Sequence, residues 1–426
     1  MNILKAILEH EVFPALGCTE PIAVAYAAGI AAQEIRGGIE ELKIKVDPGV
    51  YKNGFAVTIP NTGGERGNLI AGVLGALIGK PELKMEILKS VSDVIIGQAK
   101  ELIHTGKAKI SYDTSKTGLY IEVFIKTAHD SVRAVIEDSH MNLVRLEKNN
   151  QTLFEKESGE NSSADQEYKK VLKNMKISEF IDLAQSIDDQ DYDHIKRGID
   201  MNLKVSEAGQ KLQKAGYYIS DSVKKGYLIN DVFSSTKILT TSAADARMSG
   251  LNLSVMSSGG SGNQGIIAIL IPYNVGRYFK IEETKIVQSI ALSLLTNSYI
   301  IRFTGDLSPL CVCAIAAGAG AAAAIVYQQY GRDMGKITLA VNNLISNLGG
   351  MFCDGAKEGC ALKIATATDS AILSAYMAMN DYGTTSMEGF TGKTAEETIY
   401  YLSKISKLGM AKVDDTILGI MLEKTL

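Results

Sequence analysis

Hydrophobic and polar residues alternate along several short segments in the first third of the chain. Alternation places successive side chains on opposite faces and is typical of β-strands with one buried face. The segments that show it are Leu42–Val46, Phe55–Ile59, Lys109–Tyr112, Leu119–Lys126, Ser131–Glu137 and, as a further candidate, Met141–Glu147. Since helical segments lie among these runs and most runs follow one another closely, we expect an α+β domain with an antiparallel sheet over residues 1–150.

From Ile177 onward the spacing of apolar residues is helical almost throughout. Apolar residues that recur every three to four positions are typical of helices with one buried face. The sequence therefore predicts a mainly α-helical domain over residues 170–426, and this domain carries four of the five cysteines. The polar segment Glu147–Tyr168 is either the connection between the two domains or a long surface hairpin loop.

Composition narrows the class of protein. The chain is 46% hydrophobic, has a formal net charge of −4 and scatters its Lys and Arg residues, which argues against a nucleic-acid partner. The apolar stretch Cys311–Tyr330 is long enough to span a membrane, but its Ala and Gly gain little from lipid, so we expect a buried core helix and no membrane partner. Charged residues interrupt the apolar N-terminal stretch, unlike in a signal peptide. We therefore expect a cytoplasmic protein whose cysteines bind metal or catalyse and do not form a disulfide framework.

Four cysteines fall into two short clusters, Cys311-Val-Cys313 and Cys353-Asp-Gly-Ala-Lys-Glu-Gly-Cys360. The glycine-containing loop between Cys353 and Cys360 can bend two thiolates toward one metal centre. Cys311 and Cys313 stand at the head of a small-residue helix, where free backbone N–H groups favour a thiolate. The spacing matches neither a zinc finger nor a ferredoxin, and a single cysteine is often only a small buried apolar residue. The clustering nevertheless favours a metal site.

A glycine-rich segment, Ser257-Ser-Gly-Gly-Ser-Gly-Asn-Gln-Gly265, precedes an apolar helical run. It formally satisfies the dinucleotide-binding pattern G-x-G-x-x-G, but a strand–helix–strand unit around it is not evident. Glycine turns before a helix can instead present several N–H groups to an anion, and Ser261, Asn263 and Gln264 add donors. The segment is therefore either a carboxylate-binding loop or a flexible turn.

Two further turns could carry chemistry. Cys18 lies in Ala15-Leu-Gly-Cys-Thr-Glu-Pro21, at the expected start of a helix, where the pKa of a thiol can be lowered. Asn61 lies in Pro60-Asn-Thr-Gly63, a polar turn that is either another anion-binding loop or an ordinary connection. The five histidines are dispersed and show no metal-ligand spacing.

Together these segments resemble the iron–sulfur L-serine dehydratase superfamily, and most closely its L-cysteine desulfidase branch. The resemblance covers nearly the whole chain and rests on the Cys18 and Asn61 turns, the loop Gly259–Gly265 and the two cysteine clusters. It implies a [4Fe–4S] cluster held by Cys313, Cys353 and Cys360, with Cys311 as the alternative to Cys313. The chain departs from the serine enzymes in two places: the final cysteine pair is closer together, and Gly-Cys-Thr-Glu replaces a Ser-Ser-His-Thr stretch.

The resemblance also implies a reaction, which is the β-elimination of L-cysteine to pyruvate, ammonia and hydrogen sulfide without pyridoxal phosphate. One open iron would act as a Lewis acid on the leaving group. Cys18 is the candidate base, and the candidate carboxylate-binding residues are Thr19, Asn61, Ser261, Asn263 and Gln264. L-serine as substrate is the first alternative, and a non-enzymatic, redox-sensing, small-anion-binding protein is the second. The expected partner is a small amino acid, with a homodimer as the candidate assembly.

Overall fold

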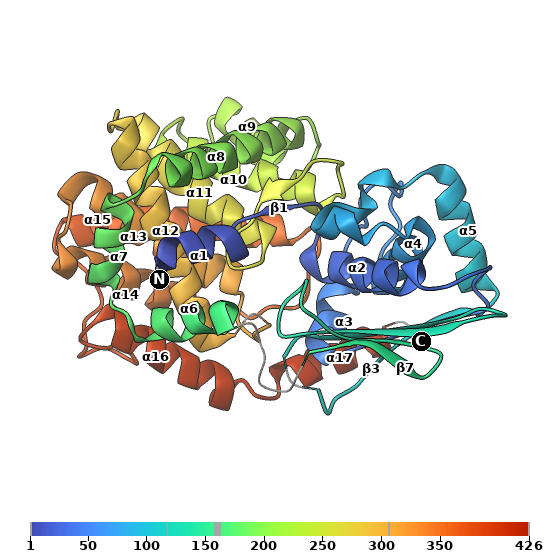
Figure 1. Cartoon of the computed structure of the whole chain (residues 1–426). Coiled ribbons are helices and arrows are strands. Elements are labelled where there is room, and N and C mark those ends of the chain that lie inside the picture. The colour runs from blue at the N-terminus through green and yellow to red at the C-terminus, as the bar shows by residue number, and fades with distance from the viewer. Residues whose placement is uncertain (1, 117, 157–162, 306, 425–426) are drawn as a thin grey trace.

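The computed structural model of the protein describes residues 2–116, 118–156, 163–305 and 307–424. It has a larger helical body and a smaller α/β body that lie side by side (Figure 1). The strands are β1 (Pro14–Ala15), β2 (Glu41–Val46), β3 (Ala108–Tyr112), β4 (Tyr120–Lys126), β5 (Ser131–Glu137), β6 (Leu143–Lys148), β7 (Gln151–Glu155) and β8 (Val255–Met256).

The helices of the α/β body are α2 (Thr19–Gln33), α3 (Pro48–Gly54), α4 (Asn68–Ile78), the 3₁₀ segment η1 (Pro81–Ser90) and α5 (Asp93–His104). The helical body contains α1 (Ile3–His10), α6 (Ser163–Asn174), α7 (Ile177–Gln185), α8 (Asp189–Gln210), α9 (Ala215–Lys224), α10 (Val232–Met248), α11 (Gly262–Tyr278), α12 (Glu283–Thr304), α13 (Val312–Tyr330), α14 (Met334–Leu348), α15 (Cys360–Met379) and α16 (Ala395–Lys404). A π segment, η2 (Ile405–Gly409), leads to the last helix, α17 (Val413–Glu423).

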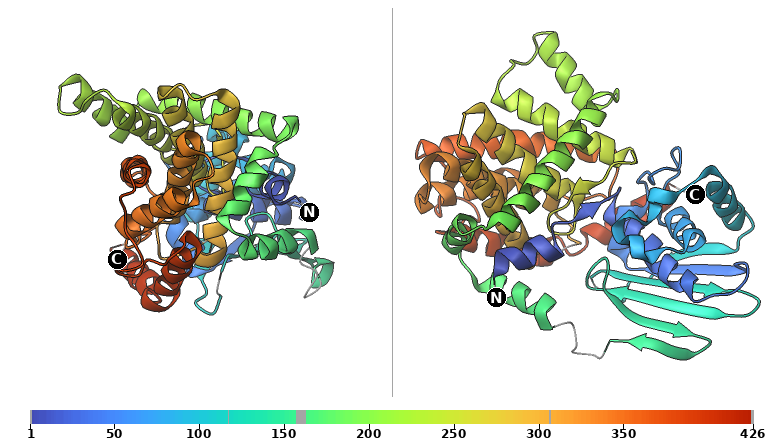
Figure 2. Two further views of the ribbon diagram at one scale, coloured as in Figure 1. Left: turned by 90° about the vertical axis from the view of Figure 1, so that its left-hand side faces the viewer. Right: turned by 45° about the horizontal axis from the view of Figure 1, so that its top comes forward.

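The α/β body is built on a six-stranded sheet in the order β3-β2-β4-β5-β6-β7. Alternate residues of its central strands are buried under α2 and α4, which lie on one face of the sheet (Figure 2). The α+β class is confirmed, but the sheet is mixed: β2 and β3 run parallel, and the other pairs are antiparallel. Parallel neighbours need a long crossover, and here α3, α4, η1 and α5 supply it. The segment Phe55–Ile59 is not a strand, since only Thr58 forms a bridge there, with Arg66.

The helical body is arranged around α13, which packs against α11, α12, α14 and α15. Small residues make this packing close: a Cβ atom on Gly320 would lie 2.5 Å from the Ser293 carbonyl oxygen of α12. Helices α12 and α13 are long and apolar enough to cross a membrane, but 83% and 89% of their most apolar windows are buried inside the protein. They are core helices, and no membrane protein is indicated.

The chain crosses between the two bodies at both ends. Helix α1 packs against α6, α7, α8 and α12, and β1 pairs with β8, so the first residues lie in the helical core although we expected residues 1–150 to form the first domain. At the other end, α17 packs against α3 of the α/β body (Figure 1). The two bodies are thus tied together by both ends of the chain.

The polar segment Glu147–Tyr168 contains ordered structure. Strand β7 forms a hairpin with β6, and α6 begins at Ser163, while residues 157–162 lie outside the described part of the chain. The first half of the segment is therefore a strand of the sheet and not a long surface loop, and α6 begins the helical body.

Asp47 offers a test of how α3 is held to the sheet. Its buried carboxylate accepts hydrogen bonds from the backbone N–H groups of Gly49 (2.7 Å), Val50 (3.1 Å) and Tyr120 (2.8 Å). We expect Asp47→Ala to lower the free energy of unfolding by about 1–3 kcal/mol, because it removes a helix cap and leaves buried donors without partners. Urea denaturation measures this change. Asp93→Ala, at an exposed position of α5, is the control, and an equal effect of the two substitutions would contradict the prediction.

Candidate functional site

All five cysteines of the chain line one cavity between the two bodies. Cys18, Glu20 and Asn53 come from the α/β body. The remaining polar lining comes from α10, the start of α11 and the two cysteine clusters, as Arg247, Ser261, Asn263, Cys311, Cys313, Cys353, Cys360 and Lys363. Residues separated by more than 300 positions in the sequence thus meet in one place.

The two cysteine clusters are brought together by backbone pairing. Leu310 and Phe352 form an antiparallel bridge, the Cys311 N–H donates to the Met351 carbonyl (2.8 Å), and the Cys353 N–H donates to the Pro309 carbonyl (2.7 Å). Cys311 caps the start of α13, Cys313 lies in its first turn, and Cys360 is the first residue of α15. The helix-start positions expected for Cys311 and Cys313 are therefore observed.

The loop from Cys353 to Cys360 is held from both sides. Lys52, almost fully buried, donates to the Cys353 carbonyl (3.0 Å) and pairs with Asp414 of α17 (2.5 Å). On the other side, Lys363 donates to the Phe352 carbonyl (2.8 Å) and to Asp354 (2.6 Å). Gly355 has φ +87°, and a Cβ atom there would lie 2.5 Å from the Lys52 carbonyl oxygen. A residue other than glycine would be strained there, both by the positive φ and by the collision of its Cβ atom with the Lys52 carbonyl.

The five thiols are free and have few partners. The Cys313 sulfur lies 3.6 Å from the Ser261 hydroxyl, the Cys353 sulfur 3.9 Å from Asn53 Oδ1, and the Cys360 sulfur 3.8 Å from the Gly355 carbonyl oxygen. Burial raises the pKa of the Cys311, Cys313 and Cys360 thiols, so the helix-start positions do not by themselves produce thiolates.

The donor set suits a cluster better than a single ion. Within the described ranges, no group of three His, Cys, Asp or Glu side chains converges closely enough to hold one metal ion. An iron–sulfur cluster is larger than an ion, and its thiolate ligands surround it instead of meeting at a point. Several thiols that are free of disulfides surround one cavity and therefore fit a cluster, and Cys311 and Cys313 are both candidates because both line the cavity.

Cys18 forms a close pair with Glu20. Cys18 occupies the residue position just before α2, and its thiol donates to Glu20 Oε2 (2.9 Å). Burial, reinforced by the Glu20 carboxylate, raises the pKa of Cys18 well above its ordinary value, opposite to the direction expected from the helix start. Burial also acts to raise the pKa of Glu20, but the nearby His140 ring and the hydrogen bond from Cys18 outweigh it and hold the pKa below its usual range. Cys18 is thus held as a neutral thiol whose proton points to an ionised carboxylate.

Asn53 connects this pair to the cysteine loop. Its side-chain amide donates to Glu20 Oε1 (3.0 Å), its side-chain oxygen faces the Cys353 sulfur, and its backbone carbonyl accepts from the Ala356 N–H (3.3 Å). Asn53 could not be identified from the sequence, because only the fold brings α3 beside the loop.

Only two of the three predicted binding residues of the glycine-rich segment line the cavity. Ser261 caps the start of α11, and both Ser261 and Asn263 line the cavity. Gln264 does not line it, since its side-chain oxygen accepts from Asn297 (2.9 Å), which also donates to Ser258 (2.8 Å). Gln264 and Asn297 therefore fix the shape of the loop.

The other two predicted binding residues lie outside the cavity lining. Asn61 has φ +62° and donates to the Leu88 carbonyl (2.9 Å), so it shapes a turn. The neighbouring Pro60 packs on Gly17, where a Cβ atom would lie 2.5 Å from Pro60 Cγ. This turn therefore supports the backbone just before Cys18. Thr19 is buried and donates to Glu20 Oε2 (3.2 Å), behind the cavity wall.

Arg247 and Lys363 are cavity residues that the sequence interpretation missed. Arg247 lies in the last turn of α10 and is only 2% exposed. The position of Arg247 among the small and apolar residues of a helix expected to be buried, Ala243–Met248, is the signal that could have identified it, because a buried arginine requires a partner.

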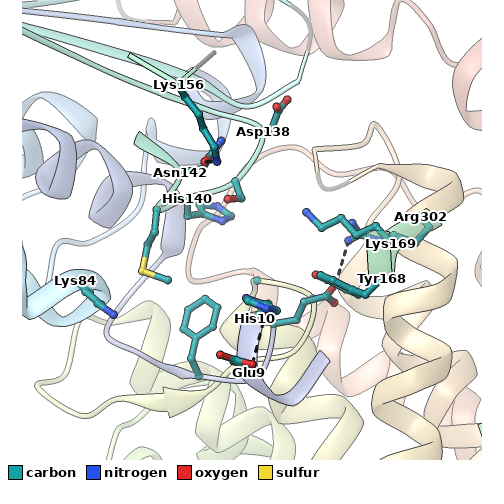
Figure 3. A pocket seen from close by; sticks show the side chains of 16 residues that line it. Glu9, His10, Lys84, Asp138, His140, Asn142, Lys156, Tyr168, Lys169 and Arg302 are labelled. Carbon is teal, nitrogen blue, oxygen red and sulfur yellow. Dashed lines mark hydrogen bonds and ion pairs between the residues drawn. The ribbon is translucent and has the colours of Figure 1, made fainter. Parts of the chain in front are cut away.

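A second hollow of about 400 Å³ lies on the other side of the glycine loop. Figure 3 shows the labelled side chains around it, among them His140, Lys156, Lys169 and Arg302. Gly259 and Gly260 line this cleft, whereas the next residue, Ser261, lines the cysteine cavity. The glycine loop is therefore the wall between the two hollows. A Cβ atom on Gly260 would lie 3.5 Å from the His140 ring.

Comparison with known proteins identifies relatives along the whole chain. A family model described as serine dehydratase alpha chain matches residues 84–419. A UPF0597 protein of Geobacter sulfurreducens is 54% identical over 424 residues, covering 100% of this chain and 99% of the relative. UPF0597 proteins of Elusimicrobium minutum (50% identical, 100% of each chain) and Clostridium tetani (39% identical, 99% of each chain) are also similar. The names of these relatives state no substrate.

Gly355 tests the construction of the cysteine loop. We expect Gly355→Ala to lower the free energy of unfolding by about 1–3 kcal/mol, because alanine disfavours a positive φ and would collide with the Lys52 carbonyl. Thermal or urea denaturation measures the change. Gly350→Ala, where an added Cβ atom meets nothing within 4 Å, is the matched control. Equal stability of the two variants would contradict the described loop.

Proposed function

The chain belongs to the serine dehydratase alpha-chain family, and from this premise we propose that it is an iron–sulfur lyase that performs β-elimination on a small amino acid. The first proposed substrate is L-cysteine, which would yield pyruvate, ammonia and hydrogen sulfide. The single observation that carries the proposal is the convergence of all five cysteines on one cavity that also holds the Cys18–Glu20 pair.

Cys313, Cys353 and Cys360 are the proposed ligands of a [4Fe–4S] cluster. Bound by three thiolates, such a cluster supplies an open iron that acts as a Lewis acid toward the leaving group. The loop contacts of Lys52 and Lys363 hold Cys353 in place, and Lys363 also lines the cavity, where its positive charge favours thiolates.

Cys18 is the proposed base. In the resting pair the thiol donates to Glu20 Oε2 at 2.9 Å, and the raised pKa of Cys18 beside the lowered pKa of Glu20 keeps the proton on sulfur. The mechanism therefore requires that this proton move to the carboxylate during turnover, which produces the thiolate. The thiolate then removes the substrate α-proton, and the electrons of the Cα–H bond form a double bond as the bond from Cβ to sulfur breaks. The proton on Glu20 can leave with the departing sulfide. Aminoacrylate then hydrolyses to pyruvate and ammonia.

The leaving group distinguishes the two candidate substrates. A soft sulfur atom suits iron, which favours L-cysteine. L-serine remains the alternative because the family description names a serine enzyme.

Reconstitution tests the function directly. After anaerobic incubation with iron and sulfide, the chain should gain charge-transfer absorbance and release pyruvate from L-cysteine, with sulfide in equal amount. A higher kcat/KM for L-serine would transfer the proposal to the serine reaction. A chain that binds no iron and releases no pyruvate from either substrate would overturn the lyase proposal and favour a redox-sensing, anion-binding protein. If Cys311→Ala loses the iron while Cys313→Ala keeps it, Cys311 and not Cys313 is the third cluster ligand.

The role of Cys18 predicts a specific kinetic defect. Cys18→Ala should lower kcat at least about 100-fold while the iron content stays unchanged, because a positioned base contributes rate and not cluster binding. Glu20→Gln should also lower kcat, since an amide cannot take the thiol proton. Iron analysis beside steady-state kinetics separates the two effects. Unchanged turnover in Cys18→Ala would remove it from the mechanism.

A further inference from the structure

Arg247 is a buried cation without a matching anion. Its side chain is in the wall of the cysteine cavity, and the residue is 2% exposed. One guanidinium nitrogen, Nη1, contacts the Met248 sulfur at 3.3 Å. The other two, Nε and Nη2, are buried and have no hydrogen-bond partner among the described residues.

An unpaired buried guanidinium is energetically costly, since a charge removed from water needs a partner to offset its lost hydration. The acidic groups near the cavity already have partners. Glu20 accepts from Cys18, Thr19 and Asn53. Asp245 accepts from the Gly216 N–H (2.7 Å), and Glu358 pairs with Lys214 (2.7 Å). The cysteines of the same lining are neutral thiols in the iron-free chain, so they do not neutralise Arg247 there. An anion that enters the cavity would match it.

The chain makes room for this guanidinium. A Cβ atom on Gly262, the first residue of α11, would lie 2.3 Å from Arg247 Nε and 2.5 Å from Val255 Cγ2. The glycine thus allows the guanidinium to lie against the start of α11, where free backbone N–H groups also favour an anion. Ser261 and Asn263 line the same cavity beside it.

We propose that Arg247 binds the α-carboxylate of the substrate, with the start of α11 as the second contact. Arginine presents paired N–H donors that fit a carboxylate, and both unpartnered nitrogens are available for it. The inference rests on the proposed function for the identity of the bound molecule as a small free amino acid. On this proposal a ligand needs a free carboxylate to bind. Gly262 is required because a side chain there would collide with the guanidinium.

Binding measurements on the full chain test this assignment, in both its iron-free and its reconstituted form. The probes are L-alanine, which has no leaving group on Cβ, and L-alaninamide, which lacks the negative charge. Calorimetry should show wild-type protein binding L-alanine at least about tenfold more tightly than the amide, because a charge-assisted pair is lost with the amide. Arg247→Met should remove this preference, and Arg247→Lys should retain part of it.

Arg277→Met, at an exposed position in the last turn of α11 and away from the cavity lining, is the matched control and should keep the preference. Thermal unfolding of the iron-free protein gives an independent readout. Arg247→Met should melt at the same or a higher temperature than the wild type, because it removes an unpaired buried charge. A marked fall in its melting temperature would show that the guanidinium has a structural partner, and would overturn the proposal.

Equal affinity of the wild type for the two probes in both forms, including no binding of either, also overturns it, as does a preference that persists in Arg247→Met. These outcomes are distinct from failure of the lyase function. Arginine-dependent binding of L-alanine by a chain that releases no pyruvate would keep the inference and remove the reaction. If Arg247→Met has an unchanged KM and still releases pyruvate, the lyase function stands and the role of Arg247 in binding the carboxylate is wrong.

Discussion

The short antiparallel pairing between residues 309–311 and 351–353 is the interaction on which the site depends. Two backbone hydrogen bonds, from Cys311 to Met351 and from Cys353 to Pro309, hold together the starts of two segments that are forty residues apart. Without them, Cys311 and Cys313 would lie on one helix and Cys353 and Cys360 on a separate loop. Because the hydrogen bonds join backbone atoms, the side chains of all four cysteines stay free to face the cavity.

The second constraint is the pairing of buried charges in and around the site. Glu20 and Lys52 are both buried, and each has protein partners that satisfy it. Arg247 is equally buried but lacks such partners within the described chain. Natural proteins keep an unpaired buried charge mainly where function uses it, since the stability it costs could be recovered by an apolar residue. Lys52 therefore has a structural role in holding the cysteine loop, whereas Arg247 has the proposed role of binding a ligand.

The sequence predicted those features that depend on local pattern. Alternation along β4 and β5 and the helical spacing beyond Ile177 identified the α+β class, and the clusters around Cys313 and Cys353 indicated the site. Contacts between segments that are distant in the sequence could not be predicted in this way. A parallel pairing of β2 with β3 leaves no trace in alternation, and Asn53 becomes a site residue only because α3 lies beside the cysteine loop. Asn61 and Gln264 were polar residues on glycine turns, as binding residues often are, yet each side chain is used to fix its own turn.

The two bodies contribute different chemistry, which makes their relative position the decisive geometric variable. The α/β body supplies Cys18 and Glu20, and the helical body supplies Arg247 and the clustered cysteines. Elimination requires a base on one side of the substrate and a leaving-group acceptor on the other, within a fraction of an ångström of the productive geometry. Both chain ends serve that requirement: the β1–β8 pairing lies directly before the Cys18 turn, and Asp414 of α17 holds Lys52 under the Cys353 carbonyl. Each of these two contacts between the bodies lies next to a site residue, Cys18 in the first case and Cys353 in the second. The contacts that join the bodies therefore also align the proposed base with the proposed ligands.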